Sequence, residues 1–281
     1  MHDKASLSNS INKELSLIFE WLSLNKLSLN VKKTKMMIFH NRQKNISRII
    51  PDLQINGIPI EFVKQFNFLG IILNEHMSWK AHINKIACNI ARTIGTLNRL
   101  KRSLPQSILK TLYTSLILPH LNYGILTWGK NPGRLQKLQK WAIRTITNSK
   151  YNAHTEPLLK QHRLLKISDL YHLSALKFYF KSQRDMLPKY FKDMFSSIQH
   201  DHNYNTRNRC ITHLRQANTA SVSVSVRYNI PQIIQNIPSC ILDKVSTHSL
   251  DGFSLYAKNH IISSYRFDCS NQNCYVCGQA E

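Results

Sequence analysis

The spacing of the apolar residues changes near residue 79, and this change limits the folds that the chain can adopt. Before it, short apolar runs alternate with turn residues, which is typical of small strands. After it, the apolar residues from 83 to 97 repeat at intervals of three and four, which predicts an amphipathic helix. Further helices are expected over residues 105–119 and after residue 133. The sequence therefore predicts an α+β fold that is mostly helical.

The part before residue 79 is expected to form a small α+β unit. Residues 7–22 carry apolar side chains at helical spacing, and residues 35–39 are typical of a short strand. Asn56-Gly57 lies between two apolar pairs, which predicts a hairpin with a type I′ turn. Residues 66–73 are expected to form one strand, with Gly70 inside it at a point of close approach.

The helices after residue 79 are expected to pack as a small bundle, followed by an irregular helical region. The second helix would carry Ile108, Leu112 and Leu116 on one apolar side. Four aromatic residues are assigned to the core rather than to base stacking, namely Tyr113, Tyr123, Trp128 and Trp141.

The charge balance of the chain is strongly positive. It holds 38 Lys+Arg against 15 Asp+Glu, a formal net charge of +23. Such a charge opposes compaction unless a polyanion offsets it, and nucleic acid is the obvious polyanion. An anionic membrane surface is the rival, but membrane binders concentrate their charge in one short helix, and here it is spread along the chain.

The cations gather where carboxylates are missing. No Asp or Glu lies between Glu75 and Glu156, yet this stretch holds many Lys and Arg. Three of these cations, Lys85, Arg92 and Arg99, recur every seven residues, so they line a helix face other than the apolar one. A generally basic composition set by an A/T-rich genome is the alternative to a phosphate-binding surface. The cations expected to contact nucleic acid are Lys85, Arg92, Arg99, Lys101 and Arg102.

Several other classes of protein are disfavoured by the sequence. The six cysteines do not form a dense disulfide framework, and the first residues have no apolar signal-peptide core. No apolar run reaches about 18 residues, so no membrane span is expected. The chain is expected to be intracellular, in the cytoplasm or the nucleus, and not secreted.

Nucleotidyl transfer needs divalent metals held by grouped carboxylates. This chain has no Asp-Asp or Glu-Glu pair, and no two acids stand in a strand-turn-strand context. The spacing of the acids therefore argues against a self-contained polymerase site.

Three segments carry a resemblance to a known family. Residues 21–39 read WLSLNKLSLNVKKTKMMIF, residues 66–73 read FNFLGIIL, and residues 112–129 hold Leu-Tyr, Ser-Leu-Ile, Pro-His-Leu, Tyr-Gly and Trp-Gly in that order. Their order and spacing resemble the late palm and the thumb of reverse transcriptases from non-LTR (LINE-type, jockey-like) retrotransposons. The resemblance is close over residues 7–148 and weaker over residues 149–265.

The resemblance implies an RNA-directed DNA polymerase that uses Mg²⁺ and holds a template–primer duplex of RNA or DNA. In this family a Tyr-x-Asp-Asp turn with metal-binding aspartates lies upstream of the position of Trp21. We therefore expect an N-terminally truncated polymerase without a magnesium site of its own.

The resemblance also implies roles for four residues of the early part. Lys33 corresponds to the lysine that gives a proton to the leaving pyrophosphate, a role that suits an ammonium group. A solvated lysine at the entrance of a strand is the alternative. Phe68, Leu69 and Gly70 correspond to the primer grip, with an ordinary buried strand as the alternative.

The end of the chain carries a C-x4-C-x2-C pattern followed by glycine, which is typical of zinc knuckles. Its members are Cys269, Cys274 and Cys277. Three thiolates do not close a tetrahedral site, so a fourth ligand would come from His260, from Cys240 or from beyond Glu281. Free cysteines are the alternative to zinc.

These observations predict four parts: a palm remnant (1–78), a helical thumb (79–150), a C-terminal helical region (151–265) and a cysteine-containing tail (266–281). The leading interpretation is a fragment of a reverse transcriptase that grips template and primer but is inactive alone. A sequence-independent nucleic-acid-binding protein derived from it, or a relic without function, are the alternatives. The oligomeric state is not predicted.

Overall fold

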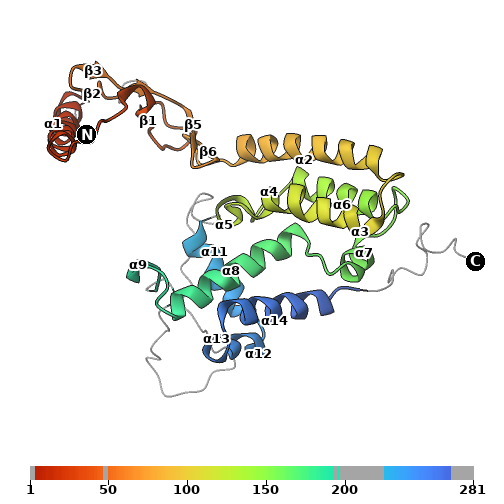
Figure 1. The fold of residues 1–281 in the computed structure, drawn as a ribbon. Coiled ribbons are helices and arrows are strands. Elements are labelled where there is room, and N and C mark those ends of the chain that lie inside the picture. Colours follow the sequence, from red (N-terminus) through yellow and green to blue (C-terminus); the bar gives the residue numbers. More distant parts are fainter. Residues whose placement is uncertain (1–3, 47–49, 193–194, 196–224, 267–281) are drawn as a thin grey trace, which may run out of the picture. The chain divides into compact units, whose positions relative to one another are not determined.

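The chain folds as two compact units, residues 1–82 and residues 83–281 (Figure 1). The computed structural model describes residues 4–46, 50–192, 195 and 225–266. Most of these residues are helical and the strands are short, which confirms the prediction of a mostly helical α+β fold. The finer division into four parts stays a prediction.

The described residues of the first unit combine one long helix with three small strand pairs. Helix α1 (Lys4–Leu24) is followed by the 3-10 turn η1 (Val31–Lys33). Strand β1 (Lys35–Met36) pairs in parallel with β4 (Glu61–Phe62), with Lys35 opposite Glu61. The Asn12 side chain ties α1 to the chain before β2, since it donates to Asp52 O and accepts from Gln54 N, both at 3.0 Å.

The predicted hairpin at Asn56-Gly57 is confirmed. Strand β2 (Gln54–Ile55) pairs antiparallel with β3 (Ile58–Pro59). Asn56 has a φ of 47° and Gly57 a φ of 73°, as a type I′ turn requires.

The single strand expected over residues 66–73 is wrong, because these residues form a second hairpin. Strand β5 (Gln65–Phe68) turns through Leu69 and Gly70 into the antiparallel strand β6 (Ile71–Asn74). Both turn residues have positive φ, 47° and 83°. Alternating apolar residues fit one long strand as well as a hairpin, and the turn is marked only by the glycine.

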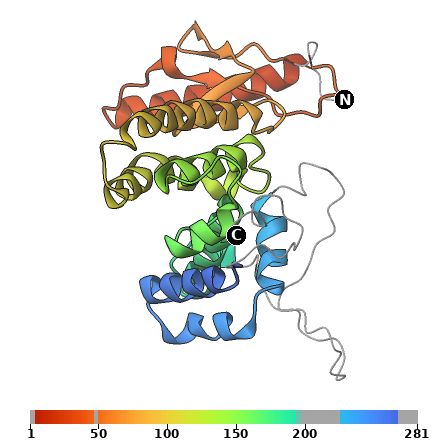
Figure 2. The same cartoon turned by 90° about the vertical axis from the view of Figure 1, so that its right-hand side faces the viewer.

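The second unit is helical. The boundary between the units falls inside α2 (Lys80–Leu100), and helices α3 (Gln106–Leu112), α4 (Leu118–Asn122), α5 (Ile125–Trp128) and α6 (Arg134–Ile146) follow. Then come α7 (Thr155–Gln161), α8 (Ile167–Gln183), α9 (Lys189–Lys192), α11 (Val226–Gln235), α12 (Ser239–Leu242), α13 (Lys244–Thr247) and α14 (Leu250–Ser263). Helix α8 runs beside α14, where the Phe180 and Phe253 ring centroids are 5.0 Å apart (Figures 1 and 2).

Helix α2 buries the predicted stripe. Ala87, Ile90 and Ile94 are fully buried, and Ile86 and Leu97 are nearly so. Each of the buried isoleucine and leucine side chains stabilises the fold by about 1.5–3 kcal/mol relative to exposure. The prediction for this helix is therefore confirmed.

The apolar face predicted for the next helix is wrong by one residue. Leu109, Tyr113, Ile117 and Leu121 are buried, whereas Ile108 and Leu116 are about half exposed. The helical segment that begins with α3 (Gln106–Leu112) also does not stop before Pro119. It continues into α4 through a π-helical turn, η2 (Tyr113–Ile117), which accommodates the missing N–H and the ring of the proline.

The Trp-Gly pair at the end of α5 has a packing reason. Trp128 is buried and its indole N–H donates to Tyr123 O at 3.0 Å. A Cβ placed on Gly129 would lie 2.4 Å from a side-chain carbon of Ile125 and 3.1 Å from the Tyr171 ring. A side chain at this position would clash with Ile125 within α5 and press on the Tyr171 ring of α8, so glycine is favoured here.

Candidate nucleic-acid interface

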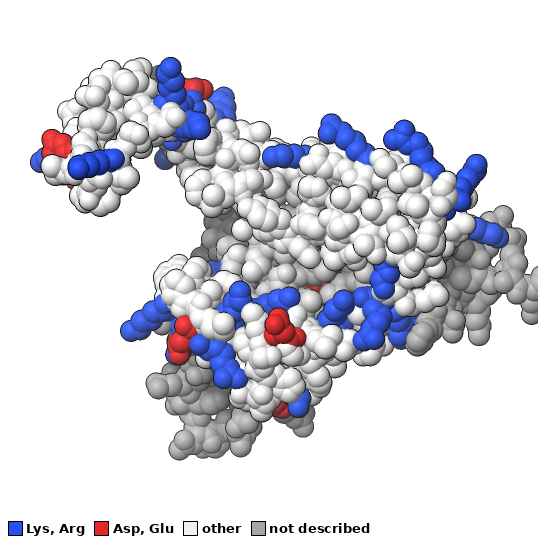
Figure 3. Space-filling model, in the orientation of Figure 1, with Lys and Arg blue, Asp and Glu red and all other residues white. Residues whose placement is uncertain are grey.

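The exposed face of α2 carries a row of cations. Lys85, Arg92 and Arg99 are all exposed, on the side of the helix away from its buried stripe. Figure 3 shows blue side chains standing out along this helix. The ion pairs found among the described residues involve other side chains, so these three have no carboxylate partner there. Solvated cations without partners suit contacts with phosphates.

The row continues at the C-terminal end of α2 with Lys101 and Arg102. Lys101 is half-buried and Arg102 exposed. Lys101 lines a pocket of about 450 Å³ that lies between α2, α6 and residues 149–151. The structure therefore places the five predicted cations on α2 and in the turn that follows it.

Two aromatic side chains line the same pocket as Lys101. Trp141 on α6 is 47% exposed and Tyr151 is 89% exposed. The assignment of Tyr113 and Trp128 to the core is confirmed, but that of Trp141 and of Tyr123, which is 56% exposed, is wrong. Exposed aromatic rings among cations are the surfaces on which nucleic-acid bases stack.

Tyr151 was not among the residues predicted from the sequence. Its signal was an aromatic residue inside a polar segment, Ser149-Lys150-Tyr151-Asn152, within the carboxylate-free stretch. Such a residue has no apolar neighbours that would draw it into a core.

Arg144 connects this pocket with a second one. It lines both the pocket with Trp141 and a smaller pocket of about 230 Å³ between α6 and α7. Its Nε donates to Ala153 O at 2.8 Å, and burial lowers the pKa of its guanidinium. This hydrogen bond holds the Arg144 side chain of α6 against the segment before α7, so the charge of the guanidinium has a defined position.

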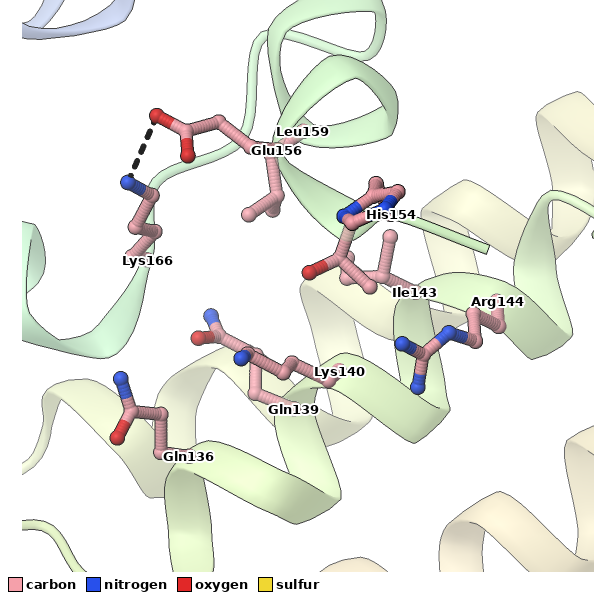
Figure 4. A pocket seen from close by; sticks show the side chains of 10 residues that line it. Gln136, Gln139, Lys140, Ile143, Arg144, His154, Glu156, Leu159 and Lys166 are labelled. Carbon is pink, nitrogen blue, oxygen red and sulfur yellow. Dashed lines mark hydrogen bonds and ion pairs between the residues drawn. The ribbon is translucent and has the colours of Figure 1, made fainter. Parts of the chain in front are cut away.

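The smaller pocket combines cations with one carboxylate (Figure 4). Lys140 and Arg144 line it from α6, and Lys166 lies across from them, 2.9 Å from Glu156. Burial acts to raise the pKa of Glu156, but the hydrogen bonds and charges of Lys166 and Arg266 together outweigh it, so the pKa falls. The carboxylate therefore neutralises Lys166 and leaves the cations on α6 without a partner in this pocket.

A buried glutamine holds α6 in place. The Gln139 amide donates to Tyr113 Oη at 3.1 Å and to Leu165 O at 2.9 Å, and it accepts from Ile167 N at 2.8 Å. Gln139 is only 3% exposed. Gln139 was not among the predicted residues, because a lone glutamine on an amphipathic helix is usually solvated.

The other predicted site residues lie in the first unit. Lys33 is exposed at the end of η1, where the Asn30 side chain accepts from Lys33 N at 3.2 Å. Phe68, Leu69 and Gly70 form the end of the β5–β6 hairpin, with Phe68 55% and Leu69 73% exposed. They are therefore not an ordinary buried strand. Their roles toward a primer or nucleotide stay predictions.

The predicted zinc ligands Cys269, Cys274 and Cys277 lie outside the described residues. Of the suggested fourth ligands, Cys240 is exposed on α12 and His260 belongs to α14. Zinc binding by the tail stays a prediction.

Comparisons with known proteins support the resemblance. The chain is 23% identical over 181 residues to the RNA-directed DNA polymerase from mobile element jockey of Drosophila funebris. The matched stretch covers 61% of this chain and 19% of that protein. It is 24% identical over 151 residues to the probable RNA-directed DNA polymerase from transposon BS of Drosophila melanogaster, covering 51% of this chain and 16% of that protein. The jockey polymerase of Drosophila melanogaster is 20% identical over 178 residues.

The chain thus spans less than a fifth of the length of these relatives. It is similar to part of the RNA-directed DNA polymerases of jockey-type non-LTR elements, as the sequence motifs predicted. No family model matches the chain, and no solved structure is similar to it. Among the described helices, none is long and apolar enough to cross a bilayer.

Proposed function

We propose that this chain is a part of a jockey-type RNA-directed DNA polymerase and that its second unit holds the template–primer duplex by its phosphates. The observation that carries the proposal is the exposed, carboxylate-free cation row on α2. Lys and Arg on a helix neutralise phosphates and fix the position of a duplex without reading its sequence. The similarity to polymerases of mobile elements supports the same assignment.

In the proposed polymerase, the first unit contributes to the active centre without holding its metals. Lys33 would give a proton to the leaving pyrophosphate, and the Phe68-Leu69-Gly70 turn would contact the primer end. No group of three carboxylates among the described residues lies close enough to hold Mg²⁺. The aspartates would have to come from another segment, so the chain alone is proposed to be inactive.

The exposed face of α1 supports a larger assembly. Leu17, Trp21 and Leu24 follow one another along one side of the helix and are 53%, 59% and 83% exposed. A contiguous apolar face of this kind marks a surface that contacts further protein. The remaining part of a palm would be the natural partner of this face.

The experiment is a titration of the purified chain with a labelled RNA–DNA hybrid at several salt concentrations. We expect affinity to fall steeply with salt, and the variant K85E/R92E/R99E to lower the magnitude of the log–log slope by about 3, one per lost phosphate contact. The variant K181E/K189E/R227E is the matched control, since it changes the net charge equally on other helices. The proposed surface would be rejected if both variants lowered the magnitude of the slope equally, or if the affinity of the parent did not change with salt.

A second function is favoured by the pocket lined by Lys101, Trp141 and Tyr151. Cations next to exposed aromatic rings are typical of proteins that bind single strands without sequence preference. The chain would then be an independent nucleic-acid-binding protein rather than a polymerase part. Tighter binding of a single strand than of a hybrid would favour this function. Thermal unfolding without a cooperative transition would instead favour the third alternative, a relic without function.

A further inference from the structure

Three side chains that are far apart in the sequence meet in the first unit. His40 follows β1, whereas Glu75 and His76 come directly after β6. A backbone hydrogen bond from His40 N to Glu75 O at 3.0 Å brings the two segments together. One ligand atom of each side chain lies within 4.8 Å of those of the other two. The side chains are largely buried, with 10%, 16% and 24% of His40, Glu75 and His76 exposed.

Backbone carbonyls define the state of both imidazole rings. His40 Nδ1 lies 2.9 Å from Asn41 O, and His76 Nδ1 lies 3.2 Å from His40 O. Because a carbonyl oxygen only accepts, each Nδ1 must carry the hydrogen and donate it. In a neutral ring the lone pair is then on Nε2, the other nitrogen.

Both Nε2 atoms face the Glu75 carboxylate. His40 Nε2 lies 3.5 Å from Oε2 and His76 Nε2 lies 3.5 Å from Oε1. These distances exceed the usual range of about 2.7–3.2 Å for a hydrogen bond. His40 Nε2 is buried and has no hydrogen-bond partner among the described residues. Each Nε2 thus faces a Glu75 oxygen without a hydrogen between them, and a cation placed there would offset the repulsion of their electron pairs.

We propose that His40, Glu75 and His76 bind a divalent transition-metal ion such as Zn²⁺. A tetrahedral zinc with bonds of about 2.0–2.1 Å separates neighbouring ligand atoms by about 3.3–3.4 Å. Each Nε2 lies 3.5 Å from one of the two Glu75 oxygens, and the three ligand atoms lie within 4.8 Å of one another. The hydrogen bonds from each Nδ1 to a carbonyl are those that orient metal-binding histidines. Mg²⁺ is not the expected ion, since it prefers oxygen ligands. The fourth position would hold water or an external ligand.

A bound ion would link the segment after β1 to the end of β6, and so stabilise the first unit. The competing occupant of this space is a proton on each imidazole, which would turn the cluster into two ion pairs with Glu75. The two occupants differ in a measurable way, because only a metal ion adds a stoichiometric component to the protein and raises its melting temperature with metal concentration.

The experiment uses the full chain with C269S, C274S and C277S, because the tail cysteines are themselves predicted zinc ligands. Zinc content after dialysis and competition against a chromophoric chelator measure stoichiometry and affinity. We expect about one zinc per chain, a rise in melting temperature with Zn²⁺ but not with Mg²⁺, and a loss of affinity of at least about 100-fold in H40Q and in H76Q. H120Q, an exposed histidine on α4, is the control and should bind as the parent does.

Two results would overturn the proposal. One is the absence of zinc binding by the chain without tail cysteines, and the other is equal zinc binding in H40Q, H76Q and H120Q. If H40Q and H76Q do not fold, imidazole nitrogen spectra of the chain without tail cysteines replace them. Zinc must then shift the Nε2 resonances of two histidines, while the Nδ1 atoms of the same two rings keep their hydrogens. Unchanged spectra would reject the site.

Discussion

Gln139 donates a hydrogen bond through Nε2 to Tyr113 Oη at 3.1 Å, and so joins α6 to the π-helical turn η2. Both side chains are buried, with 3% of Gln139 and 0% of Tyr113 exposed. The same amide caps the start of α8, because its oxygen accepts from Ile167 N. One buried polar residue of α6 therefore holds both the π-helical turn η2 and the start of α8.

Removing this amide should destabilise the chain strongly. We expect Q139L to lower the free energy of unfolding by about 2–4 kcal/mol, since Tyr113 Oη and Ile167 N lose their buried partner. Q136L, one turn earlier on the exposed side of α6, should change it by less than about 0.5 kcal/mol. Urea unfolding measures both, and equal effects would show that the buried network adds nothing.

Two buried tyrosines predict a loss of stability at alkaline pH. Burial raises the pKa of Tyr113 and of Tyr171 to about 12, although the Gln139 hydrogen bond lowers that of Tyr113 slightly. The unfolded chain loses these protons near pH 10 and the folded chain near pH 12, so the unfolded state binds fewer protons between these values. The contribution to stability is thus complete below pH 10 and is lost as the pH rises to about 12.

The tyrosine prediction can be checked by unfolding at about pH 9, 10 and 11. The parent should lose stability with a slope of up to about 1.4 kcal/mol per pH unit for each buried tyrosine, and Y113F should remove its share. Y123F alters an exposed ring and should leave the slope unchanged. A parent and a Y113F variant with the same slope would contradict the assignment.

The exposed aromatic rings should contribute to binding of single strands. We expect W141A and Y151A each to weaken binding of a labelled oligothymidine by about 1–3 kcal/mol, through lost stacking on bases. Y190A removes a ring that is 60% exposed in another part of the unit and serves as control. Fluorescence anisotropy gives the three affinities, and a similar small loss in all of them would argue against stacking.

The two hairpin turns should respond oppositely to substitution. Leu69 has a φ of 47° and is mostly exposed, so L69G should raise the free energy of unfolding of the first unit by about 1 kcal/mol. Gly57 has a φ of 73° and open space around its Cβ position, so G57A should lower it by about 1 kcal/mol through backbone strain alone. A destabilised L69G would mean that the leucine side chain makes contacts that outweigh its strain.

Much of the fold was predictable because local patterns define it. Helix α2 has one apolar side, the stripe that is buried, and no other face of this helix could enter a core. Asn56-Gly57 marks a turn by its own conformational preference. The row of Lys85, Arg92 and Arg99 follows from the seven-residue spacing, which fixes their common face before any tertiary contact is known.

The sequence alone left the helix around Tyr113 ambiguous. Two faces of this helix are apolar, and they differ by a rotation of one residue. The face with Tyr113, Ile117 and Leu121 is the buried one, and the Tyr113 hydroxyl is satisfied there by Gln139, 26 residues away. Trp141 stays on the surface because its helix already fills the core with its other apolar side chains. Such choices depend on partners that local pattern does not identify.

By itself, the sequence determined the helical class, the first hairpin, the cation row and the similarity to jockey-type polymerases. Only the tertiary structure decided which aromatic rings are exposed beside those cations, and that His40 meets Glu75 and His76. The physical reason is the range of the interactions involved. Periodicity, turn preference and charge act within a few residues, whereas buried hydrogen bonds and metal ligands join residues that the chain brings together only when it folds.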